Sequence, residues 1–219
     1  MPKLNIKTLC KEASEFSNIE SNHAETSLYG VTDGKAVGTY LEHKFKSYLK
    51  GRYVFHEGNS ASGIDFPEIN VDIKVTSITQ PQSSCPFKSA RQKIYGLGYS
   101  LLVFVYQKVD NPKTKTATLN ILHTIFINQE QTADFQTTSG ILRILENKGN
   151  KDDIMSFIFE RNLPIDEIEA NKISEEILKN PPKQGFLTIS NALQWRLQYS
   201  RVIEYAGKQN GVLSVYRAN

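Results

Sequence analysis

The sequence predicts an α/β fold in which a mixed central β-sheet is flanked by helices and followed by a C-terminal helical portion. Residues 71–76 alternate between apolar and polar side chains, as a half-buried strand does. Residues 100–107 form a continuous apolar run, which is typical of a strand buried on both faces. Residues 35–49 carry apolar side chains at helical spacing. Strands in the middle of the chain with helices on either side favour a single mixed domain.

Composition excludes several classes of protein. The chain has 219 residues, of which 39% are hydrophobic and 22% charged, as in an ordinary globular protein. We find neither an apolar stretch of roughly 20 residues nor the apolar run of a signal peptide, so we expect a cytoplasmic protein without a membrane partner. Cys10 and Cys85 are too few for a disulfide scaffold or a cysteine-based zinc site.

The N-terminal half contains two predicted helices before its first strand. Residues 5–16 favour a short helix, and the polar stretch 17–32 is typical of a loop. Residues 35–49 predict an amphipathic helix, and the small residues of 58–63 then indicate a turn. The apolar stripe of the amphipathic helix consists of Val37, Leu41, Phe45, Tyr48 and Leu49.

Further elements follow the strand at 71–76. A helix is expected at 88–95, and strands at 100–107 and 119–128. The remainder of the chain favours helices, interrupted by a Pro- and Gly-containing segment at 180–185. These expected helices cover residues 129–146, 152–160, 165–178 and 189–206.

Charge is unevenly distributed along the chain. The net charge of +3 is too small to identify a nucleic-acid-binding protein by itself. Residues 35–52 are nevertheless predominantly basic, whereas residues 152–176 are rich in Asp and Glu. One face of the molecule is therefore expected to be basic and another acidic.

An acidic residue two positions before a lysine is a weak motif, because it occurs four times in this chain. Only Asp72-Ile73-Lys74 lies in a clearly alternating strand, where residues i and i+2 point to the same face. A carboxylate and an ammonium group therefore project together from this strand. The other three occurrences are Asp33-Gly-Lys35, Glu42-His-Lys44 and Glu146-Asn-Lys148.

A second carboxylate, Asp65, precedes a turn seven residues before Asp72. A chain that folds back at this turn brings the two carboxylates together, and such oxygen ligands suit Mg²⁺. The bound metal would activate water for hydrolysis of a phosphodiester, with Lys74 orienting the water or offsetting developing charge. The alternative is an amphipathic edge strand with solvated Asp72 and Lys74 and an Asp65 that only shapes the turn.

The segment Ile64-Asp-Phe-Pro-Glu-Ile-Asn-Val-Asp-Ile-Lys-Val-Thr76 resembles the active-site segment of the MutH family of PD-(D/E)XK nucleases, which includes a mismatch-repair nickase and type II restriction endonucleases. Upstream, Gly34-Lys-Ala-Val-Gly-Thr-Tyr-Leu-Glu42 resembles the family's helix, although Lys35 sits one position away from the family's lysine. The resemblance implies Asp65, Asp72, Lys74 and Glu42 as catalytic residues, with Asp65 and Asp72 as metal ligands. Asp72 stands where the MutH segment has Glu. An alternative role for Glu42 is a surface pair with Lys46 one helical turn away.

The candidate DNA-binding residues lie mainly near the C-terminus. The expected helix at 189–206 carries side chains that read base edges or phosphates, with Trp195 and Tyr199 interleaved, although such aromatic residues are more often part of a core. The stretch 182–191 also resembles a MutH segment near its DNA-reading loop. The candidates from these comparisons are Lys35, Lys183, Gln184, Asn191, Arg196 and Arg201.

Together these features predict a sequence-specific type II restriction endonuclease that cleaves double-stranded DNA with Mg²⁺. We expect one endonuclease domain over 1–219, with its catalytic core at about 34–128 and a helical DNA-recognition portion at about 129–219. A cognate DNA methyltransferase is a possible partner, and both monomer and homodimer are compatible with the sequence. The alternatives are a mismatch-repair strand nickase and a non-catalytic DNA-binding module.

Overall fold

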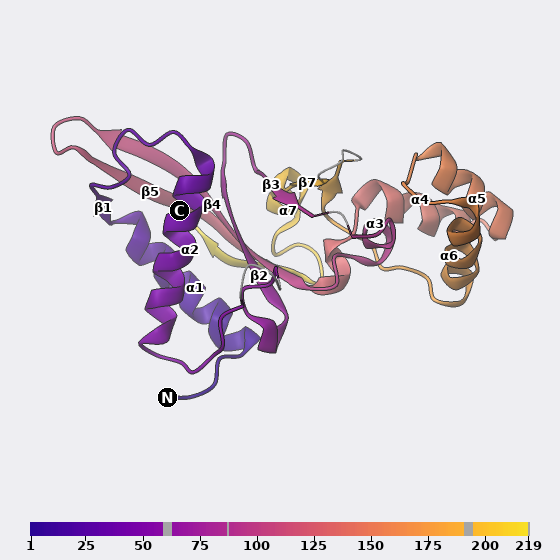
Figure 1. Cartoon of the computed structure of the whole chain (residues 1–219), viewed down its shortest axis with the longest axis horizontal. Helices are drawn as coiled ribbons and strands as arrows, with labels where there is room; N and C mark the ends of the chain where they lie inside the picture. The colour runs from indigo at the N-terminus through magenta and orange to yellow at the C-terminus, as the bar shows by residue number, and fades with distance from the viewer. Residues whose placement is uncertain (59–62, 87, 191–194, 219) are drawn as a thin grey trace.

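The computed structural model describes residues 1–58, 63–86, 88–190 and 195–218 and has a mixed sheet with helices around it (Figure 1). In this large sheet the strand order is β1-β5-β4-β2, and β8 also pairs with β5. Only β2 and β4 run parallel among these pairs. Because β2 stands at the end of the strand order, it is an edge strand beside the buried β4. The strands expected at 71–76, 100–107 and 119–128 are confirmed. The bounds are β1 Ala24–Glu25, β2 Val71–Ser77, β4 Ser100–Asn111, β5 Thr116–Ile127 and β8 Val212–Arg217.

One face of the large sheet is covered by α1 (Ile6–Ser21) and α2 (Gly34–Lys50). The apolar stripe expected on the second helix is buried here against Ile73 and Phe104 of the sheet. The first helix continues past its expected end into the polar stretch, because its polar side chains find buried partners. The Ser17 hydroxyl, for example, lies 2.6 Å from the Thr124 hydroxyl of β5.

The other face is covered by a small sheet and a short helix, where a helix at 189–206 was expected. The small sheet has the order β3-β7-β6, with β3 Gln82–Cys85, β6 Thr188–Ile189 and β7 Trp195–Gln198, and α7 spans Ser200–Tyr205. The helix prediction was wrong because the buried Trp195 and Leu197 alternate with exposed residues at the period of a strand. The strand partner β3 lies more than 100 residues earlier in the chain.

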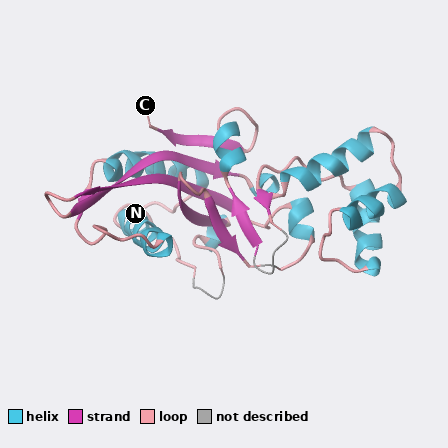
Figure 2. Cartoon of the chain, turned by 90° about the horizontal axis from the view of Figure 1, so that it is seen from above, coloured by secondary structure: helices cyan, strands magenta, loops and turns pink. Residues whose placement is uncertain are grey.

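A helical lobe occupies one end of the molecule (Figure 2). Its buried residues form a separate apolar cluster that includes Ile94, Ile141 and Ile173. The helices expected at 152–160 and 165–178 are confirmed, whereas the one at 129–146 is divided. The division falls at Asp134, whose side chain accepts a hydrogen bond from the Thr137 amide and caps a new helix. The elements are α3 Arg91–Tyr95, η2 Gln129–Thr132, α4 Phe135–Glu146, α5 Lys151–Glu160 and α6 Glu167–Lys179.

The C-terminal portion is therefore less helical than expected. It contributes β6 and β7 to the small sheet, and its last strand, β8, pairs with β5 in the large sheet. Within the described ranges, no helix is both long enough and apolar enough to cross a membrane.

Candidate active site

The chain reverses direction immediately before β2, as the turn in the sequence predicts. The short helix η1 (Pro67–Ile69) makes the reversal, and Asn70 completes it in the left-handed region with φ 54°. Phe66 and Val71 then exchange two backbone hydrogen bonds, of 2.9 and 3.2 Å, across the turn. This closed turn returns Asp65 to the side of β2.

Asp65 lies along the open edge of the large sheet. Its Oδ2 accepts a hydrogen bond of 2.7 Å from the backbone N–H of Ile73. Because β2 pairs with β4 on one side only, its outward N–H groups have no strand partner among the residues that the structure describes. The Asp65 carboxylate satisfies one of these groups and is thereby fixed beside the middle of the strand.

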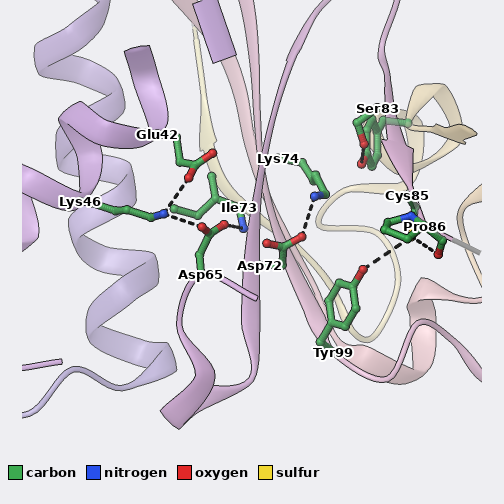
Figure 3. Close-up of polar contacts among 11 residues, drawn as sticks. Glu42, Lys46, Asp65, Asp72, Ile73, Lys74, Ser83, Cys85, Pro86 and Tyr99 are labelled. Atoms are coloured by element: carbon green, nitrogen blue, oxygen red, sulfur yellow. Dashed lines mark hydrogen bonds and ion pairs between the residues drawn. The ribbon is translucent and has the colours of Figure 1, made fainter. Parts of the chain in front are cut away.

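Asp72 and Lys74 project from β2 toward the small sheet (Figure 3). They pair in register with Leu101 and Val103, whose side chains belong to the core on that face. The Lys74 Nζ lies 2.7 Å from the Asp72 Oδ2, so the expected projection of the two groups from one face is present. Asp72 is not solvated, however, since only 4% of its surface is exposed. The small sheet covers a face that the local sequence pattern leaves open.

Glu42 and Lys46 approach Asp65 from α2, on the opposite side of the sheet edge (Figure 3). The Lys46 Nζ lies 2.6 Å from Glu42 Oε1 and 2.5 Å from Asp65 Oδ1. The i,i+4 pair considered for Glu42 is therefore formed, and it is also part of the carboxylate cluster. Sequence reasoning missed Lys46 as a member of the site, because its spacing from Glu42 is equally typical of a surface ion pair.

The two aspartates differ in their affinity for a proton. Burial, opposed by Lys74 and reinforced by the neighbouring Asp65 carboxylate, raises the pKa of Asp72 to about 7. Burial also acts on Asp65, but hydrogen bonds with Asp72, Lys46 and the Ile73 amide hold the pKa of Asp65 below its usual value. The adjacent carboxyl groups therefore favour a state in which Asp65 is ionised and Asp72 binds the proton.

The carboxylates offer a suitable ligand set for a small divalent cation. Asp72 Oδ2 is buried and, within the described residues, has no hydrogen-bond partner beyond its ion pair with Lys74. Across those same ranges, no group of three or more His, Cys, Asp or Glu side chains is placed to hold a metal ion by itself. Mg²⁺ commonly uses one or two carboxylates and completes its shell with water and phosphate oxygens. Asp65 and Asp72 fit this requirement.

Two residues of β3, Ser83 and Cys85, form a wall beside Lys74 together with Tyr99 and Tyr199 (Figure 3). The Ser83 hydroxyl lies 2.6 Å from the hydroxyl of the fully buried Tyr199, and Cys85 Sγ lies 3.6 Å from the Tyr99 hydroxyl. Burial raises the pKa of both tyrosines, which therefore stay neutral. The expectation that Tyr199 belongs to a core is confirmed, but its position near the site depends on strand pairing between β3 and β7.

The predicted DNA-binding residues do not form one cluster. Lys35 is exposed about two turns before Glu42, and Arg196 is exposed on β7. Lys183 is exposed and forms an ion pair with Glu130. Asn191 lies outside the described residues.

Gln184 and Arg201 both make contacts within the protein. The Gln184 amide group donates to Thr138 Oγ1 at 2.9 Å and to the Phe135 carbonyl at 3.1 Å. The Arg201 guanidinium lies 3.8 Å from the centre of the Phe135 ring. These contacts give both side chains a structural role.

Comparison with known proteins defines the class of this chain as a type II restriction enzyme, a site-specific deoxyribonuclease. A family model described as type II restriction enzyme NspV matches residues 3–214. A curated relative, the type II restriction enzyme NspV of Nostoc sp. (strain PCC 7524), is 68% identical over 219 residues, covering all of both chains. The chain belongs to the NspV family of type II restriction enzymes.

These findings confirm the prediction of a type II restriction endonuclease in preference to a mismatch-repair nickase or a non-catalytic module. No solved structure matches the chain. The MutH-like subclass and the PD-(D/E)XK core therefore stay predictions from the segment at 64–76.

Proposed function

We propose that this restriction enzyme hydrolyses phosphodiester bonds of double-stranded DNA at the edge of β2, with Mg²⁺ bound by Asp65 and Asp72. The observation that supports this proposal is the meeting of Asp65, Asp72 and Lys74 at the edge strand β2. Asp65 is fixed there by the Ile73 amide, and the Lys74 ammonium lies 2.7 Å from the Asp72 carboxyl. Such a combination brings metal ligands and a positive group to one point.

Each side chain has a distinct task in this proposal. Asp72 loses its proton when it becomes a ligand, since a positive charge favours the ionised carboxylate. Lys74 stays protonated, because the charge of Asp72 outweighs the effect of burial and raises the pKa of the ammonium. It can then orient the attacking water or stabilise charge that develops on a phosphate oxygen. The metal, when bound, lowers the pKa of water and acts as a Lewis acid.

Glu42 and Lys46 complete the site from α2. Lys46 links the carboxylates of Glu42 and Asp65, so we assign it a positioning role. Glu42 is near enough to this cluster to contact a metal-bound water, and burial raises its pKa despite the opposing effect of Lys46. The exposed Lys35, Lys183 and Arg196 are proposed contacts to DNA, of which the two lysines suit phosphates.

Incubation with unmethylated plasmid and phage DNA tests the proposed activity. We expect discrete fragments with Mg²⁺ or Mn²⁺, and binding with little cleavage in Ca²⁺. Lys74→Ala should abolish cleavage, and because it leaves the buried Asp72 carboxyl without its ion-pair partner, it should also lower the thermal midpoint, so that cleavage is compared at a temperature where the variant is folded. Full activity in excess chelator, or near-wild-type cleavage by Lys74→Ala, would contradict the mechanism. Nicked circles as the final product would instead indicate a nickase.

Protection of the same DNA by methylation tests the expected partner. An enzyme that cuts unmodified sites threatens its own host genome, so we propose a cognate methyltransferase that modifies the target sequence. DNA methylated at the mapped site should resist cleavage. Sedimentation of the protein with and without that DNA distinguishes a monomer from a homodimer.

A further inference from the structure

The small sheet has an outward surface that the proposed chemistry does not use. We define its outer face as Gln82, Ser84, Thr188, Arg196 and Gln198. Thr188 pairs with Gln198 and Gln198 with Gln82, so these residues form one row across three strands. Arg196 and Ser84 form the next row. Opposite residues of antiparallel strands share a face of the sheet, which makes the outer face a compact polar surface.

The reverse side of the same strands is buried. Trp195, Leu197 and Ile189 belong to the core beneath the small sheet, and none of them exceeds 3% exposure. Arg196 and Gln198, by contrast, are exposed. The strands therefore separate a structural side from a side available for contact with another molecule.

Contacts within the described residues do not engage the longer side chains of the outer face. Among those residues, the side-chain amides of Gln82 and Gln198 and the guanidinium of Arg196 form no hydrogen bond or ion pair. Gln184 makes a useful contrast, because its amide group is occupied by hydrogen bonds within the protein. Within the described part of the chain, the polar groups of Gln82, Gln198 and Arg196 are therefore available to a ligand that presents a complementary pattern.

This face is connected directly to the catalytic strand. The Thr76 hydroxyl of β2 accepts a hydrogen bond of 2.9 Å from the backbone N–H of Gln82 and donates one of 3.1 Å to the backbone carbonyl of the same residue. Thr76 follows Lys74 by two residues. Between the two rows of β3, Ser83 faces inward and contacts Tyr199 in the wall beside Lys74. The strand β3, which carries part of the outer face, is therefore linked to the strand that carries Asp72 and Lys74.

We propose that the outer face enters a groove of double-stranded DNA and reads the edges of its base pairs. Glutamine can form a bidentate pair with adenine and arginine with guanine, while serine and threonine contact either. Four of the five outer-face residues lie on β3 and β7, which pair as a two-stranded ribbon about 10 Å wide, and the major groove, roughly 12 Å wide, admits a ribbon of this kind. The proposal rests on the proposed function as a DNA endonuclease and adds the residues that determine its target.

Selection from a pool of randomised DNA duplexes tests this proposal. The protein is incubated with the pool in Ca²⁺, and bound duplexes are sequenced for the wild type and for Gln82→Ala, Gln198→Ala and Arg196→Ala. Matched controls are Gln107→Ala, which alters an exposed residue of β4 beyond its pairing with β2, and Arg143→Ala in the helical lobe. Thermal midpoints of all variants are compared in the same buffer.

We expect the wild type and both controls to select the same consensus sequence. Each outer-face variant should lose preference at one or two base positions, with discrimination there falling roughly 5- to 150-fold. An unchanged consensus in all three variants, an equal loss in the controls, or no consensus in the wild type would overturn the proposal. Cleavage by the wild type is scored separately with Mg²⁺. If the wild type cleaves DNA at discrete sites but the variants keep the wild-type consensus, the base-reading role of the outer face is wrong and the nuclease activity stands. If the variants alter the consensus but the wild type does not cleave, the proposed nuclease activity is wrong and the base-reading role stands.

Discussion

Asp72 is buried between the two sheets, and this position makes its protonation a property of the folded state. Its pKa is raised from 3.8 to about 7 in the metal-free protein, with burial as the largest cause. Between these pH values the folded protein holds a proton that the unfolded chain has lost. Stability therefore falls as pH rises through this window, and Asp72 disfavours folding most at and above pH 7.

The Asp72→Asn variant tests this effect, since the amide has nearly the same shape and no charge. In chelator, the thermal midpoint of the variant minus that of the wild type should increase as pH is raised from about 4 to 7. Cleavage should nevertheless fall at least about 10²- to 10³-fold, because a preorganised charged group has been lost. A midpoint difference that does not grow with pH would contradict the burial argument, and retained cleavage would contradict the catalytic role.

Lys46 holds two carboxylates that would otherwise repel each other. Only 10% of its side chain is exposed, so Lys46→Met should leave Glu42 and Asp65 as poorly solvated charges and cost about 3–5 kcal/mol in chelator. A divalent cation bound by the carboxylates should then raise the stability of the variant by more than it raises the stability of the wild type. The measurement is the shift of thermal midpoint with Mg²⁺ or Ca²⁺.

Lys50→Met supplies the matched control for this prediction. Lys50 pairs with Glu57 near the end of the same helix, but 62% of its side chain is exposed, so its loss should cost at most about 1 kcal/mol. Equal midpoints for the two variants would show that the Lys46 cluster is an ordinary surface ion pair.

At the level of elements, the contact between the end of α3 and η2 depends on a glycine. Gly96 has φ +90°, and a Cβ there would lie 2.3 Å from the Gln129 carbonyl oxygen. Gly96→Ala should therefore destabilise the fold by at least about 1–3 kcal/mol, because the backbone conformation and the lack of space both oppose a side chain. Gly34→Ala in α2 meets no atom within 4 Å and should be neutral or stabilising. Urea unfolding of both variants gives the comparison, and a Gly96→Ala variant as stable as Gly34→Ala would refute it.

The elements also show where sequence patterns succeed. Local periodicity predicted β2, β4 and α2, because each element buries one regular set of side chains. It also placed Asp72 and Lys74 on one face and Asp65 beside them, since the turn at Pro67 is local. The small sheet could not be predicted in this way, because β3 and β7 are short and pair across more than 100 residues. The same non-local pairing determines the burial of Asp72 and thus its pKa.

For the whole molecule, the arrangement of charge indicates how DNA approaches. The helical lobe, taken as α3, η2 and residues 135–179, has ten acidic and eight basic side chains, although the whole chain has a net charge of +3. The lobe is therefore the less favourable surface for a phosphate backbone. We expect DNA to contact the part of the molecule that contains the two sheets.

Salt dependence of DNA binding tests this orientation. Replacing both Lys35 and Lys183 by alanine should reduce the slope of log affinity against log salt by about one to two. The matched double variant Lys172→Ala/Lys179→Ala removes the same charge from the exposed surface of α6 and should keep the wild-type slope. A reduced slope for the α6 variant, with no change for the other, would place DNA on the helical lobe.

The two-sided construction of β7 has a consequence for how this protein can change over generations. Trp195 and Leu197 bind the strand to the core, while Arg196 and Gln198 between them face outward. Substitutions at the outward positions leave the packed side intact and should cost little folding free energy. A lineage can therefore vary this surface by single codon changes without first acquiring compensating mutations in the core. Asp72 and Lys74, which lie on β2 of the large sheet, can meanwhile stay constant, so that the contacts can diversify on one sheet while the chemistry is preserved on the other.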